Sequence, residues 1–166
     1  MKVLGKICGG LEWFCKNICI LLFIVMTFSA ATQVVTRMVF GSAWGWTDEM
    51  CRYTLVWTAF FSASYGVRKG SHLAIDIIIN AVPRIVQKAF SICSLCITMV
   101  AAYFLVRYGF ELSLKTFGSR STVLNLPIGG VYLAIPLSGI LIFIFAVVGL
   151  IELVSGKKIT GEEETA

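Results

Sequence analysis

Charged residues are scarce in this chain. Of its 166 residues, 14% are charged and 58% are hydrophobic, whereas ordinary soluble domains contain about 25% charged residues. A soluble fold with so little charge could not cover its core with polar surface, and a disordered chain needs the opposite composition. With a mean hydropathy of +0.88, the composition predicts a protein that lies in lipid. The basic residues are divided among apolar runs, which argues against a nucleic-acid surface.

Groups that could hold a cofactor are also few. His72 is the single histidine, so one chain lacks the two imidazoles of a bis-histidine haem, and its cysteines lack the close ligand spacing of a zinc site. Cys93 and Cys96 have the C-x-x-C spacing of a redox pair, yet they lie in an apolar run, where structural packing is the simpler interpretation. We therefore predict no catalytic residue, no metal and no cofactor, and we expect that the chain is not an enzyme. A four-span membrane redox protein that exchanges disulfides stays open as an alternative.

Four long apolar runs indicate four membrane spans. The runs are Asn17–Thr36, Tyr53–Val67, Ala89–Val106 and Ser121–Ile151. The second is short, so its helix is expected to begin earlier, with Thr47 or Asp48 as the N-cap. Small residues between Ala59 and Gly66 suit close packing of that helix against a neighbour.

The third and fourth runs predict longer helices. The third helix is expected from about residue 88 to 117, extending beyond the apolar run. In the fourth run, Pro127 fits a first helical turn and Pro136 falls inside the helix, where it predicts a kink. The fold class is therefore an all-α integral membrane protein with four transmembrane helices. Residues 1–155 form a single four-span domain, and residues 156–166 form a polar cytoplasmic tail.

The first run has a second interpretation. A cleaved signal peptide would explain Lys2, Lys6 and the small residues Ser29-Ala30-Ala31. The sequence stays apolar beyond Ala31, however, and this favours a span.

Most of the 14 lysines and arginines lie at the two termini and in the connection between spans two and three. This bias predicts that the N- and C-termini are both cytoplasmic.

The segment between spans two and three is apolar but too short to cross a bilayer. His72, Asp76 and Asn80 recur every four residues, so a helix would place them in one polar stripe. This pattern predicts a short amphipathic helix over residues 70–82 that lies in the interface. Arg84 and Lys88 follow, in position to contact the headgroups of membrane lipids.

No span centre contains Asp, Glu, Lys, Arg or His. A transport pathway needs such a group facing a cavity, so the spans favour a scaffold, and a self-contained transporter or channel is the alternative.

The polar side chains gather instead where span two begins. Asp48 and Arg52 have the spacing of an i,i+4 ion pair, for which helix stabilisation or contact with a partner subunit are both possible roles. Trp57, deeper in the helix, is either a lipid-facing ring or an interhelical anchor.

These residues resemble a known family. The sequence contains Trp46-Thr47-Asp48-Glu49, then Arg52-Tyr53, Trp57 and Arg68-Lys69-Gly70-Ser71-His72 with Asp76. This series resembles the signature of the DctQ family, the small membrane subunit of TRAP transporters. In that family a W-x-x-E motif opens the second span and an R-x-G-x-H-x-x-x-D segment follows it.

The resemblance implies a function. TRAP transporters are sodium-driven importers of bacteria and archaea that take organic acids from a periplasmic substrate-binding protein. A large membrane subunit moves the substrate by an elevator-like motion in the inner membrane, and the small subunit is similar to an added piece of stationary scaffold. The substrate cannot be read from this chain, and sialic acid and dicarboxylates both fit. The residues expected to contact the partner subunit are Trp46, Asp48, Glu49, Arg52, Trp57, His72 and Asp76.

Overall fold

The computed structural model describes residues 2–69 and 84–154, and every regular element in these ranges is a helix. The helices are α1 (Lys2–Phe40), α2 (Gly45–Arg68), α4 (Arg84–Thr116), α5 (Ile128–Tyr132) and α6 (Ala134–Val154). The predicted all-helical fold is confirmed for this part of the chain. The predicted interfacial helix over residues 70–82, with His72 and Asp76, lies outside the described residues, as does the predicted tail.

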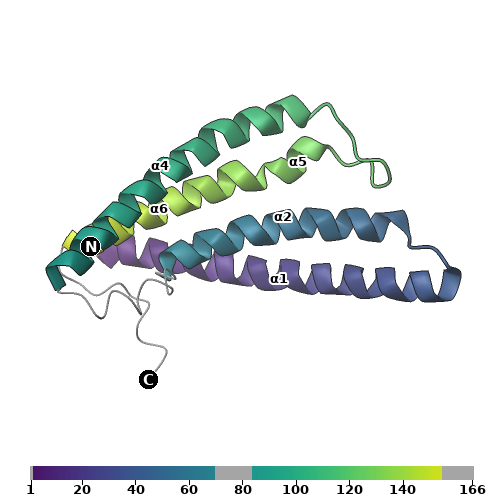
Figure 1. The fold of residues 1–166 in the computed structure, drawn as a ribbon, viewed down its shortest axis with the longest axis horizontal. Coiled ribbons are helices and arrows are strands. Elements are labelled where there is room, and N and C mark those ends of the chain that lie inside the picture. Colours follow the sequence, from purple (N-terminus) through teal and green to yellow (C-terminus); the bar gives the residue numbers. More distant parts are fainter. Residues whose placement is uncertain (1, 70–83, 155–166) are drawn as a thin grey trace, which may run out of the picture.

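The helices form two hairpins arranged as a V (Figure 1). Helices α1 and α2 lie antiparallel along each other, and α4 lies along α5 and α6. The hairpins meet where α1 begins and α6 ends, and they separate toward the connections that follow α1 and α4. The molecule therefore has a closed end and an open end.

Three helical stretches are long and apolar enough to cross a membrane, namely Cys8–Phe40, Lys88–Thr116 and Ile128–Leu153. Helix α2 is not among them, so the fourth predicted span stays a prediction. Helix α1 has 39 residues, about 58 Å at 1.5 Å per residue, and is much longer than the predicted run Asn17–Thr36. The charge-free run stops at Lys16 and Arg37, but long basic side chains are compatible with a helix and do not end it.

Pro136 bends the last helix, as the sequence predicts. The helix is interrupted at Leu133, between α5 and α6. Proline donates no backbone hydrogen bond, and its ring presses on the carbonyl four residues earlier, here that of Tyr132. The turn stays continuous because the amide of Leu133 donates to the Gly129 carbonyl at 3.1 Å and that of Leu137 donates to the Leu133 carbonyl at 3.2 Å.

A close contact places α5 against the end of α4. The hydroxyl of Ser113 donates to the carbonyl of Gly129 at 2.8 Å. A Cβ atom at position 129 would lie 2.4 Å from the Ser113 carbonyl oxygen and 2.8 Å from Cα of Phe117, so only glycine permits this approach. The contact fixes both ends of the connection between α4 and α5.

Helix α2 contacts the second hairpin through its buried face. Within the small-residue stretch of α2, Ser64 is buried, and its hydroxyl donates to the Ser138 carbonyl on α6 at 3.2 Å. Ala59, Ser62 and Ala63 are exposed. Within the chain, Ser64 therefore makes the close contact, whereas Ala59, Ser62 and Ala63 lie on the outer face of α2 and Gly66 is partly buried. Close packing of this stretch against a partner helix stays a prediction.

A group of charged side chains fastens the closed end. We call Glu12, Arg68, Lys69 and Glu152 the Arg68 cluster. The Arg68 side chain is only 7% exposed; its Nη1 donates to Glu152 Oε2 on α6 at 3.0 Å, and its Nε lies 3.7 Å from Glu12 Oε2 on α1. Lys69 Nζ lies 3.8 Å from the other Glu12 oxygen. One guanidinium therefore links α1, α2 and α6.

The Arg68 cluster adjoins the hydrophobic core. This core is formed by Cys8, Cys15, Phe61, Phe145 and Val148, which come from α1, α2 and α6. A buried arginine beside such a core is tolerated only when acidic partners compensate its charge. The two glutamates supply that compensation from two different helices.

Loss of one acidic partner is therefore expected to destabilise the fold. Glu152→Gln leaves Arg68 buried with a weaker partner and should lower the free energy of unfolding by about 1–3 kcal/mol, measured by thermal unfolding of the purified chain in detergent. Glu111→Gln is the matched control, because Glu111 pairs with Lys115 at 2.7 Å with both side chains exposed, and it should leave the melting temperature near that of the parent chain. Equal effects of the two changes would contradict a fastening role for Arg68.

Candidate functional site

The open end begins with a reversal of the chain between α1 and α2. Gly41 has φ 71°, a left-handed conformation that glycine adopts without strain. Trp44 then precedes α2 in an extended conformation as its N-cap, with no side-chain cap. The prediction of Thr47 or Asp48 as N-cap is therefore wrong. The helix starts earlier, at Gly45, and the Thr47 hydroxyl donates to the Trp44 carbonyl at 2.6 Å from inside the first turn.

The Asp48 carboxylate contacts both Arg52 on its own helix and Gln33 on α1. Its carboxylate pairs with Arg52, which confirms the predicted i,i+4 pair. It also accepts a hydrogen bond of 3.5 Å from Gln33 Nε2 on α1. The hydrogen bond from Arg52 keeps the pKa of Asp48 below its usual value, so the pair stays ionised near neutral pH.

Glu49 reaches across to the second hairpin. Its carboxylate accepts hydrogen bonds from the Ser121 hydroxyl and from the backbone amides of Val123 and Leu124, both at 3.0 Å. These donors belong to the loop of residues 117–127 between α4 and α5. The Ser121 hydroxyl, followed by the Leu124 amide, holds the pKa of Glu49 below its usual value. The glutamate of the W-x-x-E motif thus has a structural role, because Glu49 anchors this loop.

The loop is also closed by its own hydrogen bonds. The Ser121 amide donates to the Leu126 carbonyl at 2.9 Å, and the Ile128 amide donates to the Ser119 carbonyl at 3.0 Å. Arg120 Nη1 donates to the Asn125 carbonyl at 3.2 Å. Asn125 has φ 54°, in the left-handed region that asparagine tolerates better than most residues. The loop is therefore a compact turn that presents its amides to Glu49.

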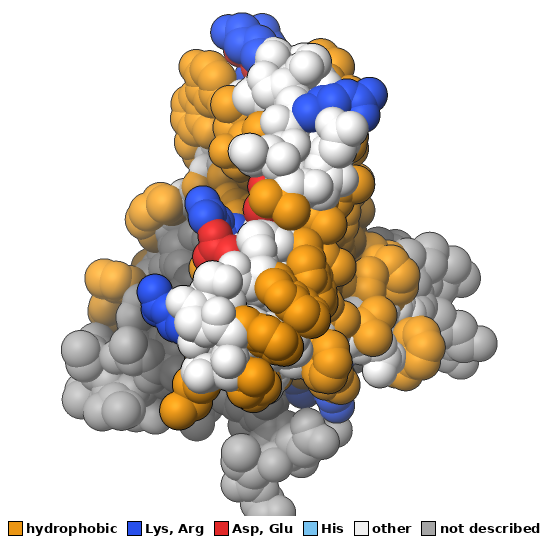
Figure 2. Space-filling model, turned by 90° about the vertical axis from the view of Figure 1, so that its right-hand side faces the viewer, with side chains coloured by type: hydrophobic (Ala, Val, Ile, Leu, Met, Phe, Trp, Pro, Cys, Tyr) orange, Lys and Arg blue, Asp and Glu red, His pale blue; other side chains and the backbone are white. Residues whose placement is uncertain are grey.

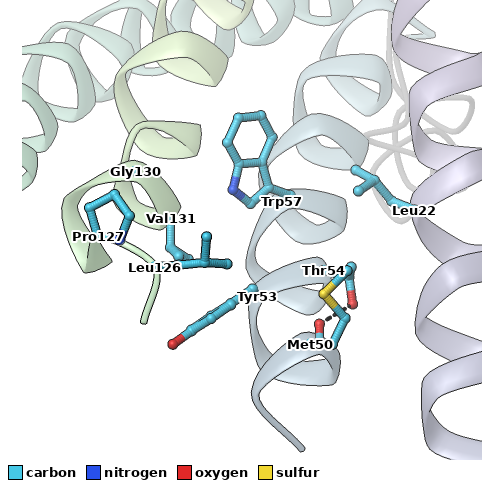
Figure 3. Close-up of a pocket in the computed structure, with 9 residues that line it drawn as sticks. All are labelled: Leu22, Met50, Tyr53, Thr54, Trp57, Leu126, Pro127, Gly130 and Val131. Carbon is cyan, nitrogen blue, oxygen red and sulfur yellow. Dashed lines mark hydrogen bonds between the residues drawn. The ribbon is translucent and has the colours of Figure 1, made fainter. Parts of the chain in front are cut away.

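Trp57 faces an apolar cleft between the hairpins (Figure 3). The cleft has a volume of about 350 Å³. Its lining comes from α1, α2, α5 and the loop before α5: Leu22, Met50, Tyr53, Thr54, Trp57, Leu126, Pro127, Gly130 and Val131. The Trp57 ring stacks on Phe61 with ring centroids 5.7 Å apart. Trp57 therefore packs against the core and also borders an open apolar space.

A second hollow of about 550 Å³ lies on the neighbouring side of α2, and we call it the polar hollow because charged side chains share its lining with apolar ones. Its charged lining residues are Asp48, Glu49, Arg52 and Arg120. Tyr53 and Val131 border both the hollow and the cleft, so the two spaces adjoin. Figure 2 looks onto this end of the molecule and shows charged side chains lying between hydrophobic surfaces.

The structure brings together most of the predicted contact residues. Trp46, Asp48, Glu49 and Arg52 lie in the first two turns of α2, and Trp46 is partly exposed beside the ring of Trp44. His72 and Asp76 fall outside the described residues. Of the predicted headgroup contacts, Arg84 begins α4 and Lys88 is exposed one turn later.

Other residues were not predicted as part of the site. The donors of the loop around Ser121 lie more than 70 residues from Glu49 in the sequence, although the polar stretch Ser119-Arg120-Ser121-Thr122 between apolar runs is a signal that could have indicated them. Within residues 2–69 and 84–154, no three His, Cys, Asp or Glu side chains are grouped to hold a metal ion. What the arrangement offers is the apolar cleft at Trp57 and the adjoining hollow with charged side chains in its lining.

The loop anchor can be tested by amide exchange. Glu49→Gln leaves one acceptor oxygen in place of two, so the amides of residues 121–124 should exchange several-fold faster in hydrogen–deuterium exchange of the purified chain, with the amides in the middle of α4 unchanged. Because the pKa of Glu49 is lowered from 4.5, its contribution is complete above pH 4.5 and is lost as the pH falls through the lower folded value. Unchanged exchange in Glu49→Gln, with the same result in the exposed control Glu111→Gln, would refute the anchor.

Comparison with known proteins agrees with these features. Residues 26–156 match the family model described as tripartite ATP-independent periplasmic transporters, DctQ component. The chain is 26% identical to a protein of Haemophilus influenzae that carries a provisional name as a TRAP transporter small permease protein, over 81% of this chain and 83% of that one.

Two further relatives match over smaller parts of their own length. The C4-dicarboxylate TRAP transporter small permease protein DctQ of Rhodobacter capsulatus is 35% identical over 55% of this chain and 41% of its own length. The sialic acid TRAP transporter permease protein SiaT of H. influenzae is 25% identical over 85% of this chain and 22% of its own length. The three membrane-length helices indicate a multi-pass membrane protein. Since the family model covers most of the sequence, the chain belongs to the DctQ family of small TRAP transporter permease proteins.

Proposed function

We propose that this chain is the stationary small subunit of a sodium-driven, binding-protein-dependent importer, and that it braces a large elevator-type membrane subunit. The observation that carries the proposal is that contacts between the two hairpins hold the V at both of its ends. The Arg68 cluster ties the hairpins at one end, and Glu49 ties α2 to the loop of the second hairpin at the other. An elevator needs a frame that keeps its shape while another part moves.

In the proposed topology, α2 forms the fourth span. Its apolar part, Tyr53–Val67, would cross the membrane, and its charged first turns would lie at the interface among Trp44 and Trp46. The start of α1 and the end of α6 lie at the same end of the V, which supports an even number of crossings. With the excess of basic residues there, both termini are assigned to the cytoplasmic side of the inner membrane.

Organic acids are the proposed cargo. The names of the relatives above specify C4-dicarboxylate and sialic acid. A further relative, the ectoine TRAP transporter small permease protein TeaB of Halomonas elongata, is 28% identical over 69% of this chain and 60% of its own length. All three compounds carry a carboxylate, so the proposal for this chain is limited to that class. The substrate-binding protein would dock transiently at the open end, where Glu111, Lys115 and Arg120 are available.

The proposed contact with the large subunit lies on the outer face of α2. Arg52 is 72% exposed at its side chain, and Trp46 is also exposed. The small residues Ala59, Ser62 and Ala63 continue the same helix as an exposed stretch that would allow a partner helix to approach closely. His72 and Asp76 are proposed to extend this contact.

Assembly with the large subunit tests the brace. A double change of Trp46→Ala and Arg52→Ala is expected to reduce several-fold the amount of large subunit recovered with a tagged small subunit, and to reduce substrate uptake with it. Trp13→Ala is the matched control, because Trp13 is 67% exposed but lies on α1 away from the proposed contact. Undiminished recovery and uptake in the double variant would exclude these two residues as the anchors.

A further inference from the structure

We propose that the open end of the V binds one phospholipid, with an acyl chain in the apolar cleft and the headgroup in the polar hollow. The inference rests on the two adjoining spaces and on the membrane location of the chain. It rests on the proposed topology, in which α2 spans the membrane, and it shares Arg52 with the proposed contact of the large subunit. It does not rest on the bracing role, because both spaces are built from this chain alone.

The cleft has the chemistry of an acyl-chain site. None of the nine residues that line it is ionisable near neutral pH, and the Thr54 hydroxyl is already engaged, because it donates to the Met50 carbonyl at 2.7 Å (Figure 3). Pro127, Leu126 and the Trp57 ring contribute apolar surface on opposite sides. Such a surface gains free energy when hydrocarbon rather than water covers it.

The hollow has the chemistry of a headgroup site. Arg52 and Arg120 both line it, and each guanidinium offers five N–H donors, of which the bonds to Asp48 and to the Asn125 carbonyl use only a part. Guanidinium groups suit phosphate oxygens. Asp48 lies beside them and can accept a bond from an ammonium group. Two acidic and two basic side chains line the hollow, so a zwitterionic headgroup, as in phosphatidylethanolamine, complements it better than a purely anionic one.

The lining of the cleft suits a lipid chain. The cleft is bordered by α1 and α2 on one side and by α5 and its preceding loop on the other, and its surface is almost entirely apolar. A single hydrocarbon chain is thin and flexible enough to enter it from the surrounding bilayer. The adjoining hollow then receives the headgroup at Tyr53, which borders both spaces.

The test is native mass spectrometry of the full-length chain in a mild detergent, titrated with dioleoylphosphatidylethanolamine. We expect a one-to-one adduct. Gly130→Leu should weaken it about tenfold, a loss of about 1.4 kcal/mol, because a Cβ at position 130 meets only Pro127 Cγ, at 3.8 Å, and a larger side chain would occupy the cleft. Gly66→Leu is the control: a Cβ there meets nothing within 4 Å, and Gly66 lines neither space.

A second arm separates the headgroup from the acyl chain. The double change Arg52→Gln and Arg120→Gln should weaken the phosphatidylethanolamine adduct about tenfold while leaving retention of dioleoylglycerol unchanged, and Lys115→Gln should change neither. Equal retention by Gly130→Leu and Gly66→Leu would overturn the site. So would loss of the adduct from the complex with the large subunit, because a partner side chain would then fill the cleft. Recovery of the large subunit, measured separately, reports on the bracing role.

Discussion

The fold depends on one buried arginine. Arg68 ends α2 with a nearly inaccessible side chain that faces acidic groups of both hairpins. An ammonium group would replace it poorly, because the planar guanidinium offers five N–H donors in a fixed fork and is more weakly hydrated, which suits a buried group that faces two carboxylates. The desolvation of these charges is offset only while Glu12 and Glu152 stay in place. The cluster therefore selects one way for the hairpins to meet, and it determines which end of the V is open.

Because the Arg68 cluster joins the hairpins at one end, the hairpins diverge toward the other end. Helices that diverge expose apolar side chains to one another across a gap, and the chain bridges the gap at one level, through Glu49 and the loop around Ser121. Behind this bridge lies the cleft at Trp57, and beside it lies the hollow at Arg52. A frame held at two points agrees with the proposed role of supporting a moving partner.

Much of the architecture could be predicted from the sequence, and the failures have physical causes. The length of the third apolar run predicts most of α4, and the steric effect of Pro136 predicts the interruption at Leu133, since both signals are local. The start of α2 was misplaced because Gly41 and Trp44 set the entry to the helix through backbone conformation rather than by a side-chain cap. The contacts of Glu49 with Ser121 and of Arg68 with Glu152 could not be predicted, because the partners lie 72 and 84 residues apart along the chain and only the packing of the helices brings them together.

The proposed bracing role requires that the V keeps its shape while transport proceeds. The most direct measurement is the distance between spin labels introduced as unnatural amino acids at Ser42 and Ser119, one on each hairpin at the open end, in the complex with the large subunit. If the V is rigid, the distance distribution is narrow and identical in sodium with and without substrate, and it is broader in Arg68→Ala. A shift in the mean distance when substrate is added to the parent complex would contradict it.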